Sequence, residues 1–179
     1  MRKLQEKNLA RRTERGFTLT ELAIATLVLL VGSVAVMQLV PAAMQSNLRN
    51  RYDTTATVIA QRELDQMITQ SLSSASFVDA DGRAIALGNV AAVNQVVGGP
   101  VVTVNNTARI NFNAPAVANY NFTYIDLNDA ARVPYEVRWA VITNAVGGVP
   151  ISKRFIVGAW KRDPRQTAPP VTIEGWVLR

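Results

Sequence analysis

The apolar and polar positions divide the chain into an uninterrupted apolar segment, an amphipathic segment and a region of short alternating runs. Leu22 to Val40 is a run of nineteen residues without a formal charge, and only Thr26, Ser33 and Gln38 within it are polar. As a helix rising about 1.5 Å per residue, this run is roughly 28 Å long. That length is close to the ~30 Å hydrocarbon core of a bilayer. The run therefore predicts a helix that spans a membrane.

A helical pattern continues after this run. Pro41 is expected to kink the helix or loosen its hydrogen bonds, because proline lacks an amide hydrogen and its ring collides with the preceding turn. Between Tyr52 and Leu72 there is no Gly or Pro, and apolar residues mostly three to five positions apart predict one apolar face: Ile59, Leu64, Met67, Ile68 and Leu72. The charged residues of this segment are expected to face water: Arg51, Arg62, Glu63 and Asp65.

Small polar residues mark the end of the helix. They are Ser71, Ser73, Ser74 and Ser76, and the sequence Asp79-Ala80-Asp81-Gly82 then predicts a turn. One helix is therefore expected from Thr18 to about Ser74. Its first half is expected in lipid or in a filament core, and its second half against a globular domain.

Residues 83–179 are rich in Val, Thr, Ile and aromatic residues and are interrupted by Gly, Pro and Asn, which is typical of short strands and turns. Seven strands are predicted: Ala84–Leu87, Val101–Val104, Ala108–Phe112, Tyr120–Leu127, Tyr135–Thr143, Lys153–Trp160 and Val171–Leu178. Asn144 to Pro150 is expected to join two of them as a hairpin. The alternating residues expected to face the helix are Tyr135, Val137, Trp139 and Val141.

The predicted fold is α+β, with a long N-terminal helix packed by its second half against a small antiparallel β-sheet. Four parts are expected along the chain. They are a basic leader at residues 1–16, a hydrophobic helix at 17–40, its amphipathic continuation at 41–75 and a globular β-sheet domain at 76–179.

Glu21 is the only charged residue between Arg15 and Arg49, and it precedes the apolar run directly. A carboxylate at a membrane edge is costly to desolvate and usually has a functional partner, here expected to be a cation. The segment Arg15-Gly16-Phe17-Thr18-Leu19-Thr20-Glu21 resembles the type IV pilin and pseudopilin family. Prepilins of that family carry a short basic leader, a Gly before the cleavage site, Phe at the new N-terminus and Glu five residues into the mature chain.

The resemblance implies a processing and assembly pathway. A prepilin peptidase would cut between Gly16 and Phe17 and methylate the new amine, and Glu21 would neutralise the Phe17 ammonium of a neighbouring subunit. The other implied partners are further pilin subunits, the pilus assembly platform and the bacterial inner membrane, crossed once with the C-terminal domain outside the cytoplasm. The pattern Tyr-x-Val-x-Trp-x-Val from Tyr135, with Trp160 in the next strand, looks like the C-terminal sheet of type IV pilus modification proteins and related minor pseudopilins.

Two other interpretations of the N-terminal segment remain open. Residues 1–43 have the order of a secretory signal, with a cut after Val40-Pro41-Ala42, but an apolar region of about 7 to 15 residues is usual there and Glu21 is left unexplained. A plain uncleaved membrane anchor is favoured by length alone.

Composition adds exclusions. The leader contains six of the 19 cations and two of the 13 acids, which leaves 13 cations and 11 acids, a formal charge of +2. The basic leader fits retention on the cytoplasmic side of a membrane. The chain has no Cys and no His, which excludes thiolate and imidazole metal sites, Ser-His triads and disulfides. No enzyme activity, cofactor or metal is predicted, and a major pilin with a disulfide-closed loop is disfavoured.

Two candidate ligand sites compete with simpler interpretations. Asp79-Ala80-Asp81-Gly82 and Asp126-Leu127-Asn128-Asp129 offer oxygen atoms for Ca²⁺, but neither has a full calcium-loop spacing and both are typical of turns. A cluster of cations with aromatic residues between them is a low-ranked polyanion contact, with the solvated face and protected edge of a strand preferred: Lys153, Arg154, Lys161, Arg162 and Arg165. Val96 to Pro100 and Gly147-Gly148 are interpreted as turns.

The leading functional hypothesis is a minor structural subunit of a type IV pilus or a type II secretion pseudopilus, assembled through its N-terminal helix. The alternative is a pilin-like DNA-uptake or adhesion protein that binds its ligand through the C-terminal domain. Nucleic acid is not an expected partner under the first hypothesis, because the mature chain has a small net charge.

Overall fold

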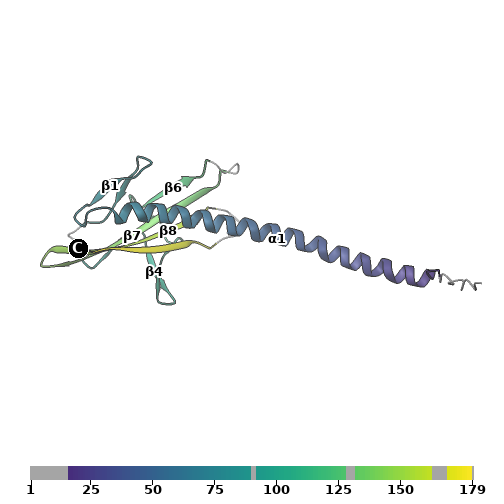
Figure 1. Cartoon of the computed structure of the whole chain (residues 1–179). Coiled ribbons are helices and arrows are strands. Elements are labelled where there is room, and N and C mark those ends of the chain that lie inside the picture. The colour runs from purple at the N-terminus through teal and green to yellow at the C-terminus, as the bar shows by residue number, and fades with distance from the viewer. Residues whose placement is uncertain (1–15, 90–91, 128–131, 163–168, 179) are drawn as a thin grey trace, which may run out of the picture. The chain divides into compact units, whose positions relative to one another are not determined.

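The structure is a computed structural model that describes residues 16–89, 92–127, 132–162 and 169–178. The leader up to Arg15, the pair Asn128-Asp129 and Arg165 lie outside the described residues. Within the described ranges, one helix precedes nine strands (Figure 1): α1 (Leu19–Ile68), β1 (Ser76–Val78), β2 (Ala84–Ala86), β3 (Val96–Gly98), β4 (Val101–Val104), β5 (Thr107–Ile110), β6 (Asn121–Ile125), β7 (Pro134–Val146), β8 (Val149–Lys161) and β9 (Val171–Leu178). The chain is therefore α+β, as predicted.

Helix α1 is continuous through Pro41, so the proline does not end the helix. The helix ends at Ile68, about six residues earlier than predicted. Beyond it, the Gln70 amide donates to the Met67 carbonyl in a tight turn, and the Ser71 and Ser73 hydroxyls bond each other. Serine side chains compete with helical hydrogen bonds in this way, which places Leu72 outside the helix.

The main sheet has the strand order β3-β7-β8-β9, and β6 also pairs with β7. β6 runs along Pro134–Arg138 and β3 along Ala140–Ile142 of the same edge of β7, all antiparallel. The predicted hairpin joins β7 to β8, with Gly147 and Gly148 at positive φ in its turn. All seven predicted strands are present, β4 and β9 with the predicted ends and the other five with shifted ends, whereas β1 and β3 were not predicted.

The chain divides into the units Met1–Gln45 and Ser46–Arg179. In the second unit, one face of the sheet packs against the C-terminal half of α1. The predicted inward set, Tyr135, Val137, Trp139 and Val141, shares a core with helix residues Ala56, Ile59, Ala60, Leu64 and Met67. The indole of Trp139 donates to the Ala86 carbonyl at 2.7 Å. The prediction that this set of β7 faces the helix is confirmed.

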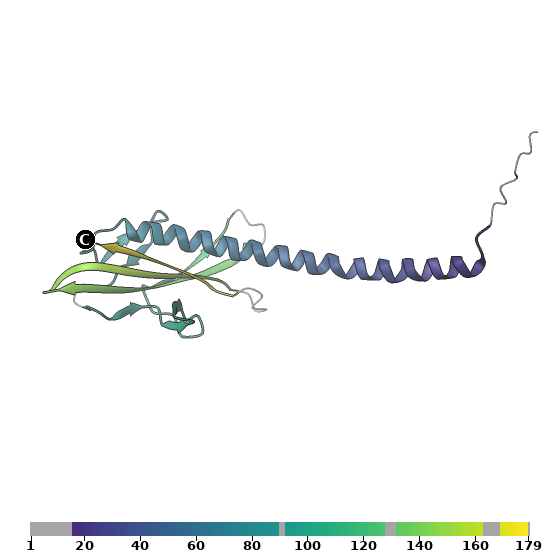
Figure 2. The ribbon, with the colours of Figure 1, turned by 60° about the horizontal axis from the view of Figure 1, so that its bottom comes forward.

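The opposite face of the sheet is also covered, which the sequence did not predict. The β4–β5 hairpin and the segment after it bring Ile110 and Phe112 against Ala140 of β7 and Ile156 of β8. Figure 2 shows this hairpin and α1 on opposite sides of the long strands. Gly158 permits the close approach, because an added Cβ would lie 2.9 Å from atoms of both Ile110 and Phe112. Residues on both faces of β7 are therefore buried.

Candidate functional site

The N-terminus of α1 contains the residues singled out by the sequence. Thr18 caps the helix: its hydroxyl accepts from the Glu21 amide at 3.2 Å, while its own amide and hydroxyl donate to Glu21 Oε2 at 2.9 Å each. This reciprocal arrangement is a capping box, which satisfies backbone donors that would otherwise lack partners at a helix start. Glu21 therefore has a structural task within its own subunit.

The same geometry leaves part of the Glu21 carboxylate available. Both bonds from Thr18 go to Oε2, and within residues 16–89 and the other described segments no hydrogen bond reaches Oε1. A carboxylate accepts several hydrogen bonds through its two oxygens, so a cation from outside the subunit can approach Oε1 without disrupting the cap. The capping role and an intersubunit charge pair are therefore compatible.

Gly16 and Phe17 are exposed ahead of the helix. The Phe17 side chain is 83% exposed, and an added Cβ at Gly16 would meet no atom within 4 Å. The described residues therefore impose no packing requirement for glycine at position 16.

The apolar segment after Glu21 has no partner within the described chain. Its large apolar side chains from Leu22 to Met44 are 47% to 73% exposed. The Thr26 and Ser33 hydroxyls donate to carbonyls of the preceding turn, so these polar groups are satisfied within the helix. By length and composition α1 is the one helix among the described residues that could cross a membrane. It is compatible with membrane anchoring.

The capping box was missed in the sequence analysis although its signal was present. Thr18-Leu19-Thr20-Glu21 has the Thr-x-x-Glu spacing of that motif, directly before an apolar run. From the sequence, only an external partner was expected for Glu21. The structure adds an internal partner at Thr18.

The candidate polyanion contact is not one surface. On β8, Lys153 and Lys161 lie on the helix side of the sheet: Lys153 is 1% exposed and donates to the Ser74 carbonyl at 2.6 Å, and the Lys161 ammonium lies 3.3 Å from the centre of the Tyr52 ring. Burial lowers the pKa of Lys153. Arg154 and Arg162 lie on the opposite side and bond Glu174 and Glu136.

The interpretation of these cations as the solvated face and protected edge of a strand is wrong, whereas a polyanion contact stays a prediction. β8 lies between β7 and β9, so the four residues do not protect an edge, and only Arg162 is exposed. The error arose because successive side chains of a strand point to opposite faces. Lys153, Arg154, Lys161 and Arg162 are adjacent in sequence but are divided between the two sides of a sheet covered on both.

A cluster of acidic residues forms where the β1–β2 turn meets α1. Asp79 and Asp81 lie in the predicted turn, and Glu63 comes from the helix, with ligand atoms within 4.8 Å of one another. The Arg83 guanidinium lies among them, 2.6 Å from oxygens of both Asp79 and Asp81 and 3.4 Å from Glu63 Oε1. Arg62 bonds Asp81 from the helix at 2.7 Å. The ion pairs of Arg83 and Arg62 therefore stabilise the turn and explain why the carboxylates lie close together.

The position of Glu63 corrects the sequence analysis, which placed it in water. Its side chain is fully buried, and Oε2 has no hydrogen-bond partner. Burial, with Asp79 and Asp81 adding to the effect, raises the pKa of Glu63 to about 7, against the opposing attraction of Arg83 and Arg62. Position 63 lies on the buried helix face between Ile59, Ala60, Leu64 and Met67. Its charged neighbour is Arg83, twenty residues later in the chain.

Comparisons of the chain with protein families, with curated proteins and with solved structures find no match.

Proposed function

We propose that the protein is a minor structural subunit of a type IV pilus or a type II secretion pseudopilus, assembled through its N-terminal helix. The supporting observation is the helix start. A single carboxylate, Glu21, stands before an exposed apolar helix, is held by Thr18 through Oε2 and keeps Oε1 available. A folded domain at the other end of the helix completes the arrangement expected of a pilin-like subunit.

In this proposal the subunit first resides in the bacterial inner membrane. The basic leader stays on the cytoplasmic side, and the domain that begins near Ser46 lies outside the cytoplasm. A prepilin peptidase removes residues 1–16 and methylates Phe17. The assembly platform then brings the Phe17 ammonium of one subunit to Glu21 of another, where low surrounding polarity strengthens the attraction. The role is non-catalytic and requires no cofactor.

Charge and capping can be separated at Glu21, because glutamine also fits the capping-box position. Glu21→Gln keeps the cap and removes the charge, whereas Thr18→Ala removes the cap and keeps the charge. We expect Glu21→Gln and Glu21→Val to be processed and inserted into the membrane yet to be strongly impaired in fibre incorporation. Thr18→Ala should be incorporated better than either variant. The measurement is the amount of each variant in sheared fibres relative to membranes.

Normal fibre incorporation of Glu21→Gln would contradict the charge-pair mechanism. In that case, loss of incorporation in Thr18→Ala would assign Glu21 to capping alone. The comparison therefore distinguishes the two tasks of one side chain.

The mass of the N-terminus tests whether the protein belongs to the pilin class. The intact mass of the membrane-extracted protein should correspond to a chain that starts at a methylated Phe17. Gly16→Ala should block or slow this processing, although the fold has room for the methyl group at position 16. A chain that starts at Met1 or at Ala43 in cells that make pili would refute the proposal.

No observation favours the alternative of DNA uptake or adhesion through the β8 cations. Lys153, Arg154, Lys161 and Arg162 contact partners within the domain and lie on both sides of the sheet.

A further inference from the structure

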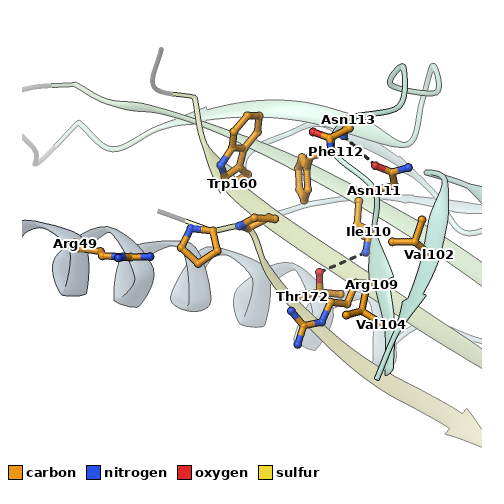
Figure 3. A pocket seen from close by; sticks show the side chains of 12 residues that line it. Arg49, Val102, Val104, Arg109, Ile110, Asn111, Phe112, Asn113, Trp160 and Thr172 are labelled. Carbon is orange, nitrogen blue, oxygen red and sulfur yellow. Dashed lines mark hydrogen bonds between the residues drawn. The ribbon is translucent and has the colours of Figure 1, made fainter. Parts of the chain in front are cut away.

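The second unit contains a pocket of about 500 Å³ beside the β4–β5 hairpin. Its lining comes from α1, from the hairpin and the segment after it, and from the ends of β8 and β9. Figure 3 shows Arg49 extending from the helix and Arg109 from β5, with Trp160 and Phe112 on the wall of the pocket. Residues far apart in the chain thus create one space.

The charge of the pocket is positive. Arg49 and Arg109 are both exposed and both line it, and no Asp or Glu is among its lining residues. Neither guanidinium forms an ion pair within the described part of the chain. In contrast, five other arginines each contact a carboxylate: Arg62, Arg83, Arg138, Arg154 and Arg162. Two unpaired guanidinium groups at one pocket favour an anionic ligand, because arginine binds phosphate and carboxylate through paired donors.

The rest of the wall is largely apolar. Val102 and Val104 of β4, which are 39% and 42% exposed, line the pocket together with Pro169 and Pro170. Asn111 and Asn113 add polar groups. This combination suits an amphipathic ligand with a charged group and an apolar part. It suits a nucleic-acid strand poorly, because such a strand requires a row of cations along its backbone.

The pocket is tethered close to the apolar segment. Arg49 follows Val40 by nine residues, without another charged residue between them. Nine residues span at most about 30 Å even when fully extended. If the apolar segment lies in a bilayer, Arg49 can therefore be no farther than that from the end of the segment. Anionic lipid headgroups are the phosphate groups present at high local concentration there.

We propose that this pocket binds an anionic phospholipid headgroup, with the positive charges of Arg49 and Arg109 attracting the phosphate and the valine and proline walls contacting the adjoining glycerol and upper acyl carbons. The proposal rests on the membrane anchoring within the proposed function but not on fibre assembly. It gives the globular domain a contact with the membrane surface while the subunit awaits assembly.

The test uses the full chain in a neutral detergent, mixed with equal amounts of phosphatidylglycerol and phosphatidylcholine and examined by native mass spectrometry. We expect preferential retention of phosphatidylglycerol. Arg49→Gln and Arg109→Gln should each weaken this preference about fivefold, the effect of about 1 kcal/mol per arginine near an anionic lipid surface. Arg132→Gln is the matched control, because Arg132 is exposed and does not line the pocket.

Equal retention of the two lipids would overturn the proposal, as would a preference that survives in both pocket variants or falls equally in Arg132→Gln. Glycerol 3-phosphate provides the soluble comparison. If it competes as strongly as phosphatidylglycerol at equal concentration, the ligand is a soluble phosphate and the lipid assignment is wrong. Circular dichroism of each variant confirms that the fold is retained.

The outcome is independent of the pilin proposal. Methylation of Phe17 and fibre incorporation are measured separately, so loss of lipid preference with normal processing and incorporation would reject only the lipid site. Absence of Phe17 processing with a retained lipid preference would reject only the pilin assignment.

Discussion

The two halves of α1 have the same backbone conformation but opposite surroundings. Before Gln45 the large apolar side chains are mostly exposed, as illustrated by Met37, which is 73% exposed. After Ser46 the helix forms one wall of the core, and Met67 is 0% exposed. The described residues thus leave the apolar surface of the first half uncovered, whereas the apolar surface of the second half is packed in the core.

The contrast separates the half of α1 that stabilises the domain from the half that is available to partners. Burial of apolar surface stabilises a fold by about 25 cal/mol per Å², so the second half of α1 contributes strongly to the stability of the domain. Among the described residues, the first half buries no comparable apolar surface, and its exposed surface is suited to lipid or to neighbouring helices. Changes in the two halves should therefore have separate consequences.

The largest effect is expected from a charge at a small buried position. Ala60→Asp should destabilise the domain by about 4 kcal/mol, because Ala60 is 0% exposed and the new carboxylate would be buried without a partner. The matched variant Ala25→Asp lies in the exposed apolar half and should leave domain stability unchanged while impairing membrane insertion. Urea unfolding followed by tryptophan fluorescence in detergent measures the first effect, and carbonate extraction of membranes the second. If Ala25→Asp also destabilised the domain, the two halves of α1 would not differ in their contribution to domain stability.

A pair of methionines in one helix gives the next comparison. Met67→Ala should lower the free energy of unfolding by about 3 kcal/mol, through lost apolar burial and the cavity left beside the sheet. Met37→Ala should change it by less than about 0.5 kcal/mol, because that side chain contacts no core. The same urea titration in detergent serves both variants. Equal effects would show that the first half also packs within the subunit.

The buried carboxylate of the second half should make stability depend on pH. Because the pKa of Glu63 is about 7 in the folded state and near 4.5 when unfolded, the folded state retains a proton that the unfolded chain releases. Protonated Glu63 contributes to the free energy of unfolding below pH 4.5, and this contribution is lost as the pH rises through 7. The expected decrease is roughly 3 kcal/mol.

Glu63→Gln should remove this decrease, since glutamine does not titrate. The measurement is the free energy of unfolding at pH 5 and pH 8 for both proteins. Glu21→Gln is the control, because Glu21 is exposed and lies in the other half of the helix. An unchanged pH dependence in Glu63→Gln would assign the effect to other groups.

The smallest effect is expected at the cap. Thr18→Ala should cost about 1 kcal/mol locally, since it removes the side-chain oxygen that accepts from the Glu21 amide. The first turn should then exchange its amide hydrogens about fivefold faster, while the exchange of amides around Met67 remains unchanged. Hydrogen exchange with mass spectrometry in detergent micelles measures both regions. Faster exchange in both would mean that the two halves of α1 unfold together.

The sequence predicted the elements whose signals are local. The alternation at Tyr135, Val137 and Trp139 predicted their common face, and the predicted span of Val101–Val104 coincides with β4. Predictions failed where a distant residue decides the surroundings. Glu63 was expected to face water but is buried beside the Arg83 guanidinium, and Lys153 is buried with its ammonium group donating to the Ser74 carbonyl.

Local sequence was enough to specify the apolar helix, its single carboxylate at Glu21 and the Thr18 spacing that caps it, because each depends on neighbours within a few residues. Tertiary structure alone decided that the β4–β5 hairpin covers the second face of the sheet, that the β8 cations are divided between two faces and that Arg49 and Arg109 share a pocket. These features depend on contacts between residues tens of positions apart. Such contacts depend on how the helix, the sheet and the hairpin pack together. The local periodicity of the sequence carries no information about that packing.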